Sequence, residues 1–153
     1  MDYNKKDKTF DEKVLEIARV SRTVKGGKRI SFRALVVVGD RKGKVGIGLG
    51  KGTEVAIAIK KASNRARKDL KFIKISEKDS IFREVVAQYG TSRVMLRPAP
   101  QGTSIIAGGV VRAVAELSGV KNLVAKLYGS NNKKNTAYAT IQGLLKAGET
   151  GRL

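Results

Sequence analysis

The sequence predicts an α+β protein in which helices cover one face of each of two small sheets. Three observations carry this prediction. Apolar and polar residues alternate over 29–38, apolar residues recur at helical spacing after residues 53 and 109, and 153 residues suffice for one medium domain or two small ones. The expected order is β-β-β-α in the first unit and β-β-α-β-α in the second. The expected boundaries are a flexible N-terminal arm at 1–11, a first domain at 12–72, a connector at 73–80, a second domain at 81–148 and a short tail at 149–153.

Three antiparallel strands are predicted to open the first unit. The segment 16–24 alternates loosely, whereas 29–38 places Phe32 and Val36 on one face and Arg33 on the other. Two glycine-containing stretches, KGGK and DRKGK, separate the three strands and read as turns.

Glycine occupies every second position of the third strand. Such a bare face indicates that a backbone, a helix or a ligand approaches it closely. A helix follows, for which Thr53 is a suitable N-cap. We expect this helix to pack on the opposite, apolar face of the strand, which leaves the glycine face for RNA or for the second domain. The glycines are Gly46, Gly48 and Gly50, the apolar strand residues are Val45, Ile47 and Leu49, and the apolar helix stripe is Val55, Ala58, Ile59, Ala62, Ala66 and Leu70.

The second unit repeats the alternation of strands and helices. Gly119 follows a helical apolar pattern and is well placed to end that helix in a left-handed cap. The expected elements are strands at 80–90, 92–99 and 122–129, a helix that ends before Gly119, and a last helix at about 136–146.

The charge of the chain points to a polyanionic partner. It holds 32 Lys and Arg against 13 Asp and Glu, a formal net charge of +19. Cysteine and histidine are absent, which excludes disulfides, thiolate metal sites and a histidine general base, and we expect no metal, no cofactor and no catalytic residue. No apolar run reaches membrane-spanning length and no signal peptide is recognisable, so we expect a cytoplasmic protein without a membrane partner.

The glycine run KVGIGLGKGT could be a phosphate-binding loop. A Walker loop requires Gly, four residues and then Gly-Lys-Ser/Thr, but here Val45 holds the first glycine position and Gly52 follows Lys51. The dinucleotide and kinase glycine patterns fail for similar reasons of spacing. A nucleotide-dependent enzyme, or any small-molecule substrate, is therefore not expected. Phosphate contact at the N-terminus of the following helix stays open. The free amides of a helix N-terminus attract anions, but Glu54 in the first turn would already satisfy the helix dipole.

The first predicted hairpin is the main candidate for RNA binding. Its stretch SRTVKGGKRISF and the Arg33 that follows surround Gly26 and Gly27 with five basic residues, three of them arginines that suit bidentate phosphate contacts. Aromatic side chains are too scarce for a base-stacking platform, so structured RNA, read through phosphate and shape, is the expected ligand. An ordinary solvated turn is the alternative.

Further candidates are weaker. The second turn adds charge on what we expect to be the same sheet edge, and the polar loop after residue 129 either binds sugar and phosphate or only caps a helix. Glycines at 102, 108 and 109 either let a helix end approach a partner or serve internal packing, which we slightly favour. The residues predicted to bind RNA are Arg22, Thr23, Val24, Lys25, Gly26, Gly27, Lys28, Arg29, Arg33, Arg41, Lys42, Lys44, Lys51, Lys60, Ser130, Asn131, Asn132 and Lys133.

Longer stretches resemble a known family. GKRISFRALVVVGDRKGKVGIGLGKGTEV is similar to the signature region of the fifth protein of the bacterial small ribosomal subunit, and GTSIIAGGVVRAV, SGVKNLVAKLYGS and NTAYATIQGL resemble the same family. The resemblance runs in matching order over residues 12–145. It implies a first domain related to double-stranded-RNA-binding modules and a second domain with a left-handed crossover. The N-terminal arm differs, and many relatives have a longer C-terminal tail, so no contact of either segment is carried over.

The resemblance also implies a function. Family members bind small-subunit ribosomal RNA, contact the fourth and eighth small-subunit proteins, support translational accuracy and help form the region where messenger RNA enters. The spectinomycin-linked loop of the family falls on residues 23–28. The interface with the fourth protein falls on Gln101, Gly102, Thr103, Ser104 and Arg112. We therefore expect a non-enzymatic ribosomal protein; the rival interpretation is a free-standing RNA chaperone or ribosome-maturation factor.

Overall fold

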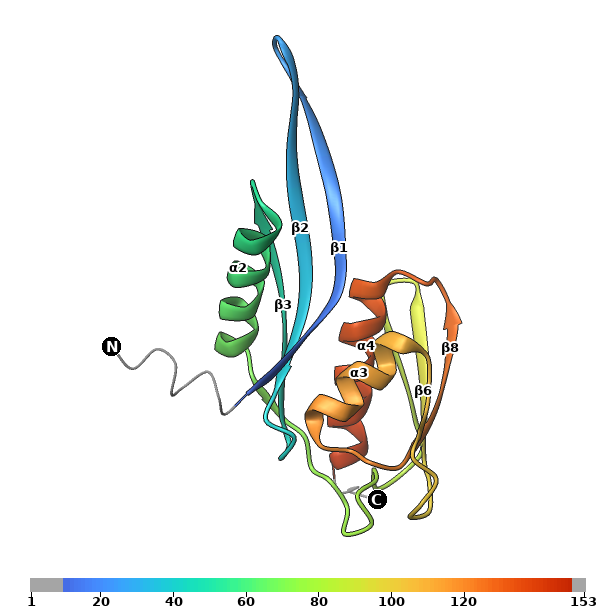
Figure 1. Ribbon diagram of the computed structural model, residues 1–153. Helices are drawn as coiled ribbons and strands as arrows, with labels where there is room; N and C mark the ends of the chain where they lie inside the picture. The colour runs from blue at the N-terminus through green and yellow to red at the C-terminus, as the bar shows by residue number, and fades with distance from the viewer. Residues whose placement is uncertain (1–9, 150–153) are drawn as a thin grey trace, which may run out of the picture.

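The computed structural model describes residues 10–149 and contains two four-stranded sheets, each with helices on one face (Figure 1). The predicted α+β class is confirmed. The first sheet has the order β1-β2-β3-β4, with antiparallel neighbours, and helix α2 packs on it. Its elements are β1 (Asp11–Val24), β2 (Gly27–Gly39), β3 (Lys44–Gly52), α2 (Val55–Lys68) and β4 (Lys71–Phe72).

The β1–β2 hairpin is much longer than the rest of its sheet. It projects past the end of α2 and past the second unit (Figure 1). Residues 21–30 are all exposed, whereas residues 34–38 of β2 are buried. One strand therefore belongs to the core at one end and to the surface at the other.

Helix α2 lies on the glycine face of β3, so our expectation that it packs on the apolar face is wrong. A Cβ added at Gly46, Gly48 or Gly50 would lie 2.3, 2.0 and 2.4 Å from the carbonyl oxygens of Ala66, Ala62 and Ala58, respectively. Alanine faces glycine at each turn, so the helix backbone rests almost directly on the strand. The glycine face is thus covered by the helix of its own unit, and neither RNA nor the second domain lies against it.

The ends of α2 also differ from the prediction. Glu54, not Thr53, is the N-cap residue, and its side chain makes no capping hydrogen bond. The helix ends at Lys68, so Leu70, which we predicted as part of its apolar stripe, lies outside it. Glycine on β3 and alanine on α2 let the helix lie close to the strand. We infer that this packing, and not a side-chain cap, fixes the start of α2.

The second sheet has the order β5-β6-β8-β7, and α3 and α4 cover one of its faces (Figure 1). A short strand that we did not predict, β7, pairs in parallel with β8, and α3 connects the two. The left-handed sense of this crossover stays a prediction. Gly119 ends α3 in the left-handed conformation with φ 103°, as predicted. The elements are β5 (Val85–Tyr89), β6 (Ser92–Pro98), β7 (Ile105–Ile106), α3 (Gly109–Ser118), β8 (Leu123–Gly129) and α4 (Lys133–Gly148).

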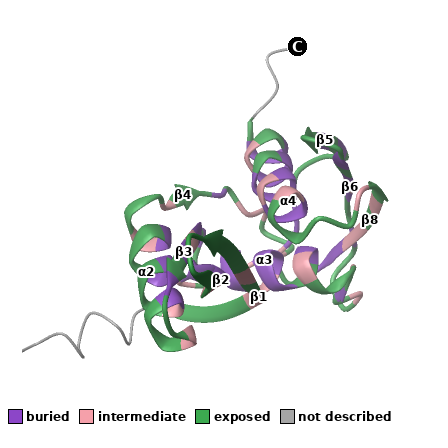
Figure 2. Cartoon of the chain, turned by 90° about the horizontal axis from the view of Figure 1, so that it is seen from above, coloured by how far each residue is buried: buried purple, intermediate pink, exposed green. Residues whose placement is uncertain are grey.

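The two units share one hydrophobic core. The apolar face of β2 and β3, which α2 leaves free, joins a single cluster with residues of α3, β6, β8 and α4. Figure 2 shows buried residues on the sides of the helices that face the sheets. A Cβ at Gly39 would lie 2.1 Å from the carbonyl oxygen of Leu117, so β2 and α3 touch through their backbones. No helix among residues 10–149 is long and apolar enough to cross a membrane.

Candidate nucleic-acid interface

The tip of the hairpin is open. Val24 pairs with Gly27, and the turn between them is Lys25 and Gly26, whose φ of 100° lies in the left-handed region that favours glycine. In the part of the chain that the structure describes, no atom comes within 4 Å of a Cβ built at Gly26 or Gly27. A flat, narrow tip of this kind can approach a nucleic-acid backbone closely.

The strand register places basic residues directly opposite one another. Arg22 pairs with Arg29, and Arg33 pairs with Lys51 at the end of β3. Like charges directly opposite in a sheet repel and destabilise it. All four lie on one face, because paired residues share a face and Arg29 and Arg33 are four residues apart on β2. We call Arg22, Arg29, Arg33 and Lys51 the cationic ladder.

The other face of the hairpin carries cations too. Arg19, Ser21, Lys28 and Ile30 line a hollow of about 270 Å³ there. The prediction missed Arg19, although strict alternation back from Ser21 along β1 would have placed it on this face. The hairpin therefore presents positive charge on both sides of a thin two-stranded ribbon.

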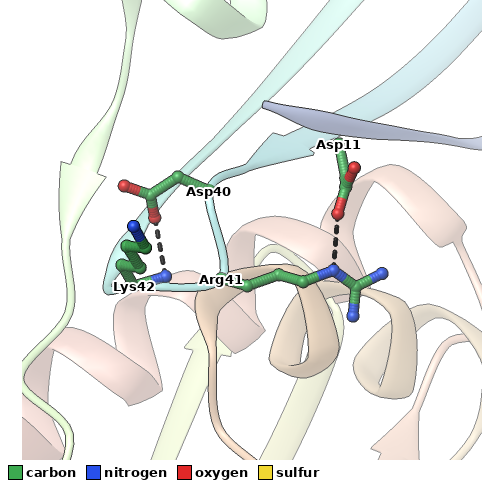
Figure 3. Close-up of polar contacts among 4 residues, drawn as sticks. All are labelled: Asp11, Asp40, Arg41 and Lys42. Atoms are coloured by element: carbon green, nitrogen blue, oxygen red, sulfur yellow. Dashed lines mark hydrogen bonds and ion pairs between the residues drawn. The ribbon is translucent and has the colours of Figure 1, made fainter. Parts of the chain in front are cut away.

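The second turn lies at the opposite end of β2, so our expectation that it extends the same charged edge is wrong. Strand β2 (Gly27–Gly39) is 13 residues long, which places its two ends about 40 Å apart at the usual rise per residue. The Arg41 Nε lies 2.6 Å from the Asp11 carboxylate, and Asp40 accepts a hydrogen bond from the Lys42 backbone N–H at 2.8 Å (Figure 3). The backbone of this second turn is hydrogen-bonded to α3, since Arg41 N donates to the Leu117 carbonyl oxygen at 3.0 Å.

Two other lysines predicted to bind RNA, Lys51 and Lys60, lie on different surfaces. Lys51 joins the ladder, as described above. Lys60 is exposed on α2, where it lines a different groove together with Glu12 and Arg67. Glu54 is the N-cap residue of α2 and its side chain makes no capping hydrogen bond, and the phosphate contact that we left open at this helix end stays a prediction.

The loop between β8 and α4 lies at the end of the second unit on the side toward which the hairpin of the first unit points (Figure 1). Here the capping alternative accounts for two of the four predicted residues. Asn132 is the N-cap of α4 and its side chain accepts from Asn135 N at 3.2 Å, while the Ser130 hydroxyl accepts from Asn132 N at 3.2 Å. Asn131 and Lys133 remain exposed and available to a partner.

The predicted protein interface is a rigid turn. The Asn122 side-chain oxygen accepts hydrogen bonds from Gly102 N at 3.2 Å and Ser104 N at 3.1 Å. Ser104 lines a hollow of about 370 Å³ together with Glu116, to which Arg112 is ion-paired at 3.0 Å. The fold therefore brings the turn at 101–104 close to the ion pair of Arg112, although Ser104 and Arg112 are eight positions apart in the sequence.

The glycine pair before α3 does not serve internal packing, which corrects the interpretation that we slightly favoured. No described atom lies within 4 Å of a Cβ built at Gly102, Gly108 or Gly109. Gly108 is the N-cap of α3 and makes no side-chain cap.

The described residues add neither a metal site nor a titratable group with a shifted pKa to the charged surfaces. Across residues 10–149, no three Asp or Glu side chains gather where they could hold a metal ion. The pKa of Tyr138 is raised, first by burial and then by the neighbouring Tyr89, on which its ring stacks at 5.1 Å. This tyrosine belongs to the core of the second unit and not to the charged surfaces.

Comparison with known proteins covers both units. Residues 10–74 match the family model described as ribosomal protein S5, N-terminal domain, and residues 87–149 match the one described as ribosomal protein S5, C-terminal domain.

Individual relatives agree over nearly the whole chain. It is 47% identical over 139 residues to small ribosomal subunit protein uS5 of Acaryochloris marina, 49% over 137 residues to that of Mycoplasma pneumoniae, and 48% over 139 residues to that of Legionella pneumophila. These matches cover 91%, 90% and 91% of the chain and 78%, 62% and 82% of the respective relatives. The resemblance of the motifs is thus confirmed, and the chain belongs to the ribosomal protein S5 family, a family of ribosomal proteins and not of enzymes.

Proposed function

We propose that the chain is a structural constituent of the small ribosomal subunit and that it binds ribosomal RNA through the β1–β2 hairpin. The single observation that supports this most is the cationic ladder. Arg22 and Arg29 face one another across two strands, as do Arg33 and Lys51, at a surface where the protein supplies no compensating packing. Such repulsion is relieved when phosphates lie along the ribbon.

The mechanism is phosphate neutralisation by a rigid wedge. Cations on both faces, with Arg19 and Lys28 opposite the ladder, suit a ribbon that lies between two RNA segments. Guanidinium groups bind phosphate oxygens in a bidentate manner, and the glycine tip allows the backbone itself to come close. Each neutralised phosphate releases counterions, so binding weakens steeply as salt rises.

The shared core gives the wedge a fixed base. Backbone contacts between β2 and α3, through Gly39 and Leu117, hold the two units in one arrangement. A hairpin on such a base positions RNA relative to the surfaces of the second unit. We infer that the turn at 101–104 and Arg112 contact the fourth small-subunit protein, that the chain also contacts the eighth, and that it supports translational accuracy and the region where messenger RNA enters.

The experiment that tests the proposal is sedimentation of a cell lysate through a high-salt sucrose gradient, with an antibody against this chain. A structural constituent stays in the small-subunit peak at one copy per particle. Release into light fractions, or presence only in immature particles, would contradict the proposal and identify a chaperone or maturation factor instead.

A further inference from the structure

The second sheet has one face that no helix covers. Helices α3 and α4 lie on the same side of β6 and β8 (Figure 1). Alternation along β6 shows the two sides directly: Val94 and Leu96 are buried beneath the helices, whereas Arg93 and Arg97 are exposed and Met95 is partly exposed. The odd-numbered β6 positions from 93 to 97 therefore lie on the open side.

The register extends this open side across all four strands. Directly paired residues share a face, so each row can be followed across three neighbouring strands, two rows over β5, β6 and β8 and the third over β6, β8 and β7. The rows are Gln88, Arg93 and Tyr128; then Val86, Met95 and Lys126; and then Arg97, Val124 and Ile106. We call these nine residues the open sheet face.

The open sheet face exposes large apolar side chains. Val86 is 50% exposed, Ile106 56% and Tyr128 47%, and they come from three different strands. Met95, in the central row, lies among them and is partly exposed. Apolar side chains gathered on one regular surface indicate that another macromolecule covers it, because singly scattered ones need no such explanation.

Positive charge is interleaved with these apolar residues. Among residues 10–149, Arg93 and Lys126 take part in no ion pair, whereas Arg97 is 3.5 Å from the Glu84 carboxylate. This surplus of cations disfavours a second copy of the chain, since the same charges would meet across the interface. It favours a partner with carboxylates at matching positions.

RNA is less suited to this surface than protein. Single-stranded RNA binds on sheets through several stacked aromatic rings, and the face has only Tyr128. Duplex phosphates suit the cations but leave Val86, Met95 and Ile106 with nothing to pack on. Tyr, Met and Arg are, in contrast, the residue types enriched at the centres of protein interfaces.

We propose that the open sheet face binds a protein surface that carries acidic side chains among apolar ones. This inference rests on the proposed function, because the partner is met within the small subunit. Met95, Val86 and Ile106 supply apolar contact, while Arg93 and Lys126 pair with the partner's carboxylates. No residue of this face belongs to the hairpin, to the loop after β8 or to the turn at 101–104, so it is a separate surface.

The test is site-specific photocrosslinking in assembled subunits. The chain is expressed with a photoreactive benzophenone amino acid in place of Met95, and in a second variant in place of Val86 at the exposed edge. Small subunits are isolated on a gradient, irradiated, digested with protease and ribonuclease, and analysed by mass spectrometry. We expect both probes to give an adduct with a peptide that contains Asp or Glu beside apolar residues.

Charge reversal makes the test specific. Adding Arg93→Glu and Lys126→Glu is expected to lower the adduct yield roughly tenfold or more, as for loss of interface hot spots. The matched control, Lys78→Glu with Lys146→Glu, reverses two exposed lysines away from the face and is expected to leave the yield unchanged.

The outcomes separate this inference from the proposed function. A chain that sediments with subunits but gives a ribonucleotide adduct, no adduct, or a peptide adduct insensitive to charge reversal overturns the sheet-face inference alone. A chain that sediments free of subunits and forms no peptide adduct overturns both.

Discussion

The two halves of β2 show how one strand can serve two purposes. Residues 34–38 are buried on both faces, beneath α2 on one side and against the second unit on the other. Residues 27–30 belong to the same strand but are exposed. The difference arises because α2 and the second unit both end before the hairpin does. Beyond the part of β2 that α2 and the second unit cover, the strand carries arginine and lysine in place of core residues. This exposed part is available for RNA binding and adds little to stability.

The largest expected effect breaks the buried half. In Gly48→Val, the new Cβ would meet the Ala62 carbonyl oxygen, 2.0 Å from an ideal Cβ position, and backbone on both sides prevents relief. We expect a loss of about 3 kcal/mol or more in the free energy of unfolding. Urea denaturation followed by circular dichroism measures it.

A matched control for that substitution is Gly109→Ala. The site has open space in the described structure and lies in the first turn of α3, so we expect no loss and a gain of up to about 1 kcal/mol. Equal stability of Gly48→Val and the unmodified protein would contradict the close packing of α2 on β3.

The second prediction separates the units without disturbing either. In Gly39→Ala, the added methyl group lies 2.1 Å from the Leu117 carbonyl oxygen, at the contact between β2 and α3. We expect a loss of about 1–3 kcal/mol, the usual range for overpacking. Differential scanning calorimetry should show one transition for the unmodified protein and a broadened or split one for the variant. A sharp, unshifted transition would show that the units do not depend on this contact.

The third prediction concerns the exposed half. Replacing Lys25, Lys28 and Arg29 with Ala should leave the free energy of unfolding within about 0.5 kcal/mol, because these side chains are exposed. Affinity for small-subunit RNA should fall about 10- to 100-fold, and the salt slope of log K should decrease by about one for each cation that contacts phosphate. Filter binding over a range of salt concentrations measures both. Undiminished affinity in the folded variant would remove the hairpin as the main site.

The smallest effect sharpens the comparison in the loop after β8, where binding and structural residues lie side by side. Asn132→Ala removes the N-cap of α4 and should cost about 1 kcal/mol of stability. Asn131→Ala, at the exposed neighbouring position, should leave the free energy of unfolding unchanged; any effect should be on RNA binding. A similar stability loss in both variants would show that the cap is not what distinguishes them.

We predicted wrongly on which side of β3 α2 packs and what covers the glycine face, and both errors have one physical reason. The alternation in β3 was correctly identified, and glycine on one face correctly indicated a close neighbour. We expected the helix on the side of the larger apolar residues Val45, Ile47 and Leu49. Those side chains are instead buried by the second unit, and α2 packs through Ala58, Ala62 and Ala66 onto bare backbone.

A candidate site could be proposed from the sequence where its residues are contiguous, but not where it depends on distances in space. The hairpin is a contiguous stretch, so charge, glycines and turn could all be identified in the sequence. The second turn looked equivalent, yet it lies at the far end of β2 and its Arg41 is ion-paired to Asp11. The open sheet face could not be predicted from the sequence, because its nine residues come from four strands whose order in the sheet, β5-β6-β8-β7, differs from their order in the chain.

The sequence by itself determined the α+β class, the hairpin with its basic tip, the left-handed end of α3 at Gly119 and the family. Each of these depends on neighbours along the chain: alternation, charge density, a residue that tolerates positive φ, or a motif in fixed order. Only the tertiary structure decided which face of β3 receives α2, that the two units share a core, and which sheet face is left open. These depend on which apolar surfaces meet. A strand such as β2, which is apolar on both faces, does not by its own sequence determine which element packs on which face.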